Sequence, residues 1–207
     1  MNLTLYIIII TGIVSFLAFN DQRMMQRLIF NPYVIHQRKE WYRFISSGLI
    51  HADWLHLIVN MFVLYSFGGV VEDYYKIYFG DQAVVYFLLL YVGGLMASVL
   101  ITYKKQKDNP GYNALGASGA VSGIVFASIV FDPMQKLALY GVIELPGIIF
   151  GVLYIIFCYY MDKRGGTGIN HDAHLWGAVY GFVFTIILRP SLFLLFIDKL
   201  VFWRHDI

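Results

Sequence analysis

The sequence is poor in charge and in cysteine. Only 14% of its 207 residues are charged, against about 25% in soluble domains, whereas 59% are apolar and 18% aromatic. This balance excludes a disordered chain and an ordinary cytosolic enzyme, and it indicates an integral membrane protein surrounded by the lipid bilayer. A net charge of +2 without a block of Lys or Arg gives no reason to expect a nucleic-acid partner. The single cysteine, Cys158, excludes an internal disulfide.

Long apolar runs predict an all-α membrane protein with six spans in a single domain over residues 1–207. A helix that crosses a bilayer needs about 17–25 mostly apolar residues. The predicted spans are 3–19, 55–71, 83–103, 114–131, 137–161 and 173–188. Segment 20–50 mixes cationic and aromatic residues, and segment 191–203 is too short to span. We expect both of these segments to lie in the membrane interface.

The few strongly polar residues in the spans lie near the beginning of the second, fourth and sixth. An ionisable residue inside a span costs about 2.5–3.5 kcal/mol to insert, so each one needs a reason. These residues are His56 and Asn60 on the second span, Ser118 on the fourth and His174 on the sixth. Because successive spans alternate in direction, all even-numbered spans begin at the same membrane surface. We therefore expect these side chains at a similar depth.

Small residues on the fourth and sixth spans predict a close helix pair, because small residues let helices approach in lipid. One stripe comprises Gly119, Gly123 and Ala127, and the other His174, Gly177, Ala178 and Gly181. If the stripes pack together, Ser118 and His174 lie side by side, which is the minimum for an activated nucleophile. The imidazole can then take the hydroxyl proton and return it to a leaving amine. The Ser118 backbone N–H, the Asn60 amide and His56 are candidate donors to the oxyanion.

These motifs resemble those of the rhomboid family of intramembrane serine proteases. The family's G-x-S-G stands at 116–119, with Gly123 beyond it, and its A-H-x-x-G-x-x-x-G stands at 173–181. Its H-x-x-x-N is formed by His56 and Asn60, with His51 before them. The resemblance covers about residues 41–188 and places three motifs, in order, on alternate spans.

The resemblance implies a six-helix rhomboid-like bundle with Ser118 as nucleophile and His174 as general base. It also implies an oxyanion hole at His56 and Asn60, a cap at 165–168, a lateral gate at the fifth span, and membrane-helix substrates. No metal or cofactor is expected. The glycines expected to pack near the site are Gly116, Gly119, Gly123, Gly177 and Gly181.

The distribution of charge and the resemblance predict opposite orientations of the protein in the membrane. Ten Lys and Arg residues follow the odd-numbered spans and five follow the others, so the positive-inside rule places the odd loops, and the site with them, in the cytoplasm. Bacterial members of the family usually have the active-site side outside. We follow the resemblance and expect a bacterial inner membrane protein.

The remaining polar residues near these motifs are expected to have structural rather than catalytic roles. Ser122 is expected to be a packing residue, and His51 and His171 to lie at the mouth of the site. Asp172 is expected near a helix start rather than in a catalytic triad. Cys158 has no histidine near it in the sequence, so we expect it in the core.

Other classes of protein fit less well. A metal-dependent intramembrane protease needs H-E-x-x-H, which the sequence lacks. An aspartyl protease needs two aspartates within spans, and Asp132 and Asp162 lie at span ends. No internal repeat of a transporter is visible. The remaining alternative is a rhomboid-like protein that binds membrane helices without cutting them, although such relatives typically lack the serine or histidine. The sequence does not specify a substrate or an oligomeric state.

Overall fold

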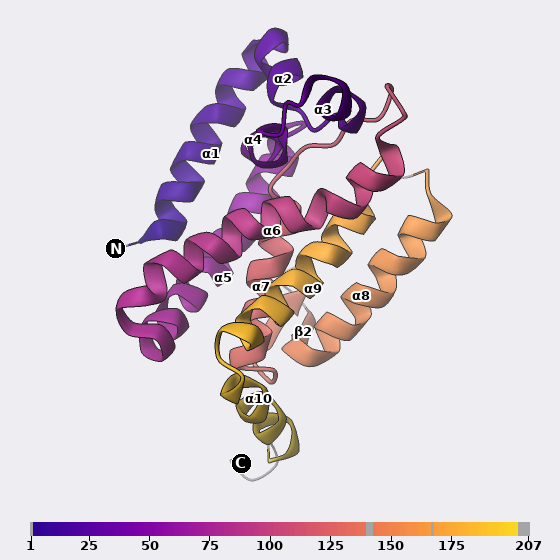
Figure 1. The fold of residues 1–207 in the computed structure, drawn as a ribbon. Coiled ribbons are helices and arrows are strands. Elements are labelled where there is room, and N and C mark those ends of the chain that lie inside the picture. The colour runs from indigo at the N-terminus through magenta and orange to yellow at the C-terminus, as the bar shows by residue number, and fades with distance from the viewer. Residues whose placement is uncertain (1, 140–142, 167, 203–207) are drawn as a thin grey trace.

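The computed structural model describes residues 2–139, 143–166 and 168–202, and most of them are helical (Figure 1). The α-helices and strands are α1 (Leu3–Asn20), α2 (Gln22–Leu28), α3 (Pro32–Arg38), α4 (Arg43–Ser46), α5 (Trp54–Phe79), α6 (Ala83–Gln106), α7 (Ser118–Phe131), β1 (Lys136–Leu139), β2 (Ile143–Pro146), α8 (Gly147–Arg164), α9 (His171–Leu188) and α10 (Ser191–Val201). Short 3₁₀ helices, η1 (Ser47–Leu49) and η2 (Gly80–Gln82), precede α5 and α6.

Two apolar stretches of the described ranges are long enough to cross a membrane. One is α1, and the other is the continuous stretch Trp54–Gln106, which contains α5 and α6. The bent pair formed by α9 and α10, at 112° to one another, gives a third if it is counted as one span. Helices of this length and composition indicate an integral membrane protein.

Helix α7 is the innermost element. Every residue from Gly119 to Phe131 is buried, and α7 packs against α9, α6 and α5 (Figure 1). At a rise of about 1.5 Å per residue, its 14 residues extend much less far than the 26 of α5 or the 24 of α6. The first residue of α7 therefore lies within the bundle rather than at its end.

The predicted fifth span is wrong in its first part. Strands β1 and β2 pair antiparallel at residues 137–139 and 143–146, which were expected to be helical, and α8 begins only at Gly147. Residues 140–142 of the predicted span lie outside the described residues. Pro146 explains this start, because proline lacks an N–H and disfavours helical backbone at the residue before it. This proline lies inside the predicted span and was the sequence signal for a later start.

The fourth span also begins later than predicted. Ala114 forms an isolated antiparallel bridge with Phe30, and Gly116 has a φ of 111°, so neither residue can belong to the helix. The irregular segment before α7 satisfies its backbone through other segments: the two N–H···O bonds of the bridge are 3.0 Å long, and the Gly116 N–H donates to the Ser47 carbonyl at 2.9 Å. This pairing allows a non-helical segment to lie inside the bundle.

Helices α2, α3 and α4 fold segment 20–50 against α1 and α6. Asp21 and Asn31 cap α2 and α3 by accepting backbone N–H bonds. Phe30, Ile35 and Phe44 form a small core that packs against α6. Segment 20–50, which the sequence places at the membrane interface, is therefore folded and packs against the helix bundle.

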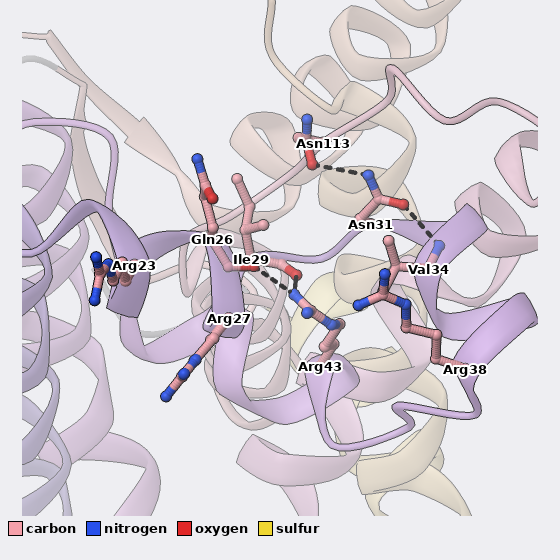
Figure 2. A pocket seen from close by; sticks show the side chains of 9 residues that line it. All are labelled: Arg23, Gln26, Arg27, Ile29, Asn31, Val34, Arg38, Arg43 and Asn113. Atoms are coloured by element: carbon pink, nitrogen blue, oxygen red, sulfur yellow. Dashed lines mark hydrogen bonds between the residues drawn. The ribbon is translucent and has the colours of Figure 1, made fainter.

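Arginine side chains surround a pocket of about 490 Å³ in this segment (Figure 2). Arg43 is the buried one: it donates to the Glu40 carboxylate at 2.7 Å and to the carbonyl oxygens of Gln26 and Ile29, both at 2.8 Å. The hydrogen bond from Arg43 lowers the pKa of the Glu40 carboxyl group below its usual value. Arg43 thus ties α2 to α4.

We expect Arg43→Gln to lower the free energy of unfolding by about 3 kcal/mol, because losing one member of a buried pair leaves its partners unsatisfied. The matched control is Arg27→Gln, since Arg27 lines the same pocket but is exposed and has no ion pair within the described ranges. Unfolding in detergent measures the stability of both variants. If the two substitutions lower the free energy of unfolding equally, Arg43 does not tie α2 to α4 as the structure indicates.

Candidate active site

Ser118 and His174 lie side by side at the beginnings of two packed helices. His174 Nε2 is 2.7 Å from Ser118 Oγ. Ser118 is the first residue of α7, and His174 lies in the first turn of α9. The structure therefore brings together the two residues that the sequence proposes as nucleophile and base.

Glycines account for the closeness of α7 and α9. A Cβ added to Gly177 would collide with the backbone carbonyl of Gly119, and one added to Gly181 would collide with that of Gly123. The two helices touch backbone to backbone, which only residues without a side chain permit. The predicted facing of the two stripes is present in the structure.

His56 and Asn60 lie near the beginning of α5, where Asp53 caps the helix by accepting the His56 N–H at 2.8 Å. The Nδ1 atom of His56 accepts the Ala52 N–H at 3.4 Å, so we assign the ring proton to Nε2. That edge of the ring lies against Gly116. The Asn60 amide donates one N–H to the His56 carbonyl at 2.9 Å, which leaves a second N–H on the same nitrogen.

The sequence analysis expected His51 at the mouth of the site, and this prediction is wrong. In the structure His51 is fully buried. The hydroxyl of Ser15 donates to the Leu49 carbonyl at 2.9 Å, so His51 Nδ1 is the donor in its 3.0 Å bond to Ser15. Its Nε2 accepts the Ala117 N–H at 3.4 Å. His51 therefore ties α1 to the residue directly before Ser118.

The start of α9 is fastened to two other helices. Asp172 lies in the first turn, as predicted, and accepts hydrogen bonds from Lys105 at 2.8 Å and Trp176 at 3.1 Å. Lys105 Nζ is also 3.5 Å from Asp162 at the end of α8. His171, expected at the mouth, is 5% exposed and faces Phe157 of α8. These contacts set the position of the turn that carries His174.

Ser122 links Ser118 to α8. Its hydroxyl donates to the Ser118 carbonyl at 2.8 Å and lies 2.6 Å from the hydroxyl of Tyr154, which is therefore the donor in that bond. The packing role predicted for Ser122 thus takes the form of a hydrogen-bonded link. The sequence did not indicate Tyr154, because α8 contains several tyrosines and their spacing does not distinguish one of them.

Cys158 is buried, as expected, but it has histidine neighbours. Its Sγ and one ring nitrogen each of His171 and His174 all lie within 4.8 Å of one another. The sequence interpretation missed this cluster because Cys158 reaches α9 only through the packing of α8.

A cavity of about 1250 Å³ opens beside the Ser118 hydroxyl. Its polar residues include His56, Asn60, Ser118 and His174, and its apolar residues include Val59, Val63, Phe126 and Phe150. Gly165, Gly166 and Gly168 also line it, each with positive φ, and the fourth residue of the predicted cap, Thr167, lies outside the described residues. A serine paired with a histidine in such a cavity can attack a carbonyl group.

Comparisons with known proteins identify the family of this chain. The Rhomboid domain model matches residues 38–191. Rhomboid-like protein 11, chloroplastic, of Arabidopsis thaliana is 28% identical over 180 residues, which are 81% of this chain and 60% of that protein. RHOMBOID-like protein 12, mitochondrial, of the same plant is 27% identical over 191 residues, which are 85% of this chain and 54% of that protein. This chain thus spans just over half the length of these two relatives.

A bacterial relative is covered more fully. Rhomboid protease GlpG of Haemophilus influenzae is 27% identical over 172 residues, which are 83% of this chain and 81% of that protein. The family model covers most of the present chain, including the whole Ser118 and His174 region. The chain therefore belongs to the rhomboid family.

Proposed function

We propose that this protein is an intramembrane serine endopeptidase that cuts membrane-helix substrates with a dyad of Ser118 and His174. The observation that carries the proposal is the 2.7 Å contact between Ser118 Oγ and His174 Nε2 in the wall of a cavity. A packing serine has no need of a histidine partner or of an open space beside its hydroxyl.

In the proposed reaction His174 takes the Ser118 proton as the oxygen attacks the substrate carbonyl, and it later protonates the leaving amine. The Ser118 backbone N–H is free of helical bonds because it begins α7. That N–H, the remaining Asn60 N–H and His56 Nε2–H are the proposed donors to the oxyanion. Water then hydrolyses the acyl-enzyme.

The proposed membrane arrangement has six spans in one domain: α1, α5, α6, α7, α8 and α9. Helix α7 extends about 21 Å, which is less than the roughly 30 Å hydrocarbon core, so Ser118 lies below the membrane surface. Segment 20–50 and α10 lie at the interface. We propose the bacterial inner membrane, with the site facing outward, although plant organellar relatives are equally similar.

The substrate is proposed to enter between α5 and α8, because both helices contribute apolar residues to the cavity. A bound peptide must have an extended backbone there, since a regular helix has its carbonyl groups in hydrogen bonds. Membrane segments that contain helix-breaking residues are therefore the favoured substrates.

Labelling by a fluorophosphonate in detergent tests the proposal against that of an inert helix-binding protein. We expect label on the wild type and on Ser122→Ala, but none on Ser118→Ala. Ser122 is the matched control because it stands one turn away with its proton already donated. A wild type that takes no label but still binds membrane helices supports the inert alternative.

Asn60→Ala is expected to lower kcat at least about tenfold while KM changes little. Loss of one oxyanion donor costs about 100- to 1000-fold elsewhere, but the Ser118 N–H and His56 can partly replace it here. The measurement uses a helical substrate in proteoliposomes, beside the unfolding midpoint. If kcat holds and only stability falls by about 1 kcal/mol, Asn60 acts through its bond to the His56 carbonyl alone.

A further inference from the structure

The cluster of Cys158, His171 and His174 shares His174 with the proposed dyad. Cys158 comes from α8, whereas the two histidines stand three residues apart on α9, with ring centroids 6.0 Å apart. The three potential ligand atoms all lie within 4.8 Å of one another. The mechanism uses His174 alone and leaves the thiol and the second imidazole without a role.

One thiol and two imidazoles are ligands that favour Zn²⁺ over hard cations such as Mg²⁺. Tetrahedral Zn²⁺ with bonds of about 2.0–2.3 Å holds its ligand atoms roughly 3.3–3.7 Å apart. The three atoms therefore have to approach by about 1 Å, which small rotations of the side chains provide. Three protein ligands leave the fourth position for water.

An ion can reach this cluster through the active-site cavity. His174 lines the cavity, together with Asp162 and Asp172. These two carboxylates share the single ammonium group of Lys105, so this part of the wall attracts cations. Cys158 and His171 are buried next to His174 and complete the binding groups.

We propose that Cys158, His171 and His174 form an inhibitory site for Zn²⁺. Binding forms a bond between the metal and the Cys158 sulfur and releases the thiol proton to solvent, with no redox change. The inhibition rests on the proposed function. If the metal binds His174 through Nδ1, the ring proton moves from Nδ1 to Nε2, which then can no longer accept the proton of Ser118. If it binds through Nε2, it replaces the Ser118 hydrogen bond.

Co²⁺ is the spectroscopic probe for binding, because a thiolate ligand gives it a charge-transfer absorption that histidine and carboxylate ligands do not. We expect one Co²⁺ per chain of the purified full-length protein in detergent, with this absorption, and displacement by Zn²⁺. Cys158→Ser removes the absorption. The control is His36→Gln on α3, far from the cluster in the chain and bonded to Tyr103, which should retain it. Absence of the absorption in the wild type overturns the proposal.

Inhibition is measured separately, as cleavage of a helical substrate at buffered Zn²⁺ concentrations. We expect Zn²⁺ to inhibit the wild type reversibly, with activity restored by a chelator. Cys158→Ser should retain its basal rate and need at least about tenfold more Zn²⁺, since even a supporting residue of a metal site contributes that much. Equal Zn²⁺ sensitivity of the two proteins overturns the proposed site.

The two arms separate failure of this site from failure of the proposed function. If no protein cleaves substrate but the cobalt absorption depends on Cys158, the metal site stands and the protease assignment fails. If Cys158→Ser does not fold, His171→Gln replaces it: loss of one nitrogen ligand should weaken Zn²⁺ binding at least about tenfold. Unchanged binding in that variant contradicts the cluster.

Discussion

Ser118→Ala and His174→Ala are each expected to reduce cleavage of a membrane-helix substrate by at least about 10,000-fold. The alanine at 118 has no oxygen to attack the carbonyl, and the alanine at 174 has no nitrogen to take the proton across the 2.7 Å contact. Because the two residues act as one unit, the double variant should be no less active than either single one. Initial rates in proteoliposomes measure all three.

The unfolding midpoint of each variant distinguishes loss of catalysis from loss of the folded structure. Ser118 and His174 are both partly exposed to the cavity, so truncating them should change the unfolding midpoint little. Turnover of Ser118→Ala above about a thousandth of the wild-type rate would show that another group attacks the substrate. The dyad assignment would then be wrong, and the cavity would have to be searched for a second nucleophile.

The core helices were predictable because their apolar runs and small-residue stripes are properties of consecutive residues. The spacing of Gly177 and Gly181 from His174 is enough to place all three on one face of a helix. The ends of the helices were less predictable. The hairpin before α8 depends on Pro146, and the late start of α7 depends on a bridge between Ala114 and the distant Phe30.

The surroundings of the candidate site were the least predictable part. His51 reaches Ser15 and Ala117, which belong to segments far from it in the chain, so the sequence offered no sign of its burial. The same holds for Tyr154 with Ser122, and for Cys158 with His171. In each case a side chain meets its partner through the packing of separate segments of the chain. The apolar pattern indicates that helices pack but not which polar side chains meet.

The second large effect on activity is expected at the backbone contact between α7 and α9. Gly177→Ala and Gly181→Ala should each lower activity by about 100-fold, because the added methyl group collides with the carbonyl of Gly119 or Gly123 and moves α9 outward. His174 stands one turn before Gly177, so a shift of about 1 Å separates it from Ser118. Overpacking of this kind also costs about 1–3 kcal/mol of stability.

Gly69→Ala on α5 is the matched control, because a Cβ there meets no atom within 4 Å. Replacing an unhindered helical glycine by alanine stabilises a helix by up to about 1 kcal/mol. The control should therefore raise the unfolding midpoint, whereas Gly177→Ala and Gly181→Ala should lower it. Rates and midpoints measured together distinguish the cases. If both substitutions on α9 raise stability as Gly69→Ala does and leave the rate unchanged, α7 and α9 are further apart than the structure places them. The contact between Ser118 and His174 would then need another explanation.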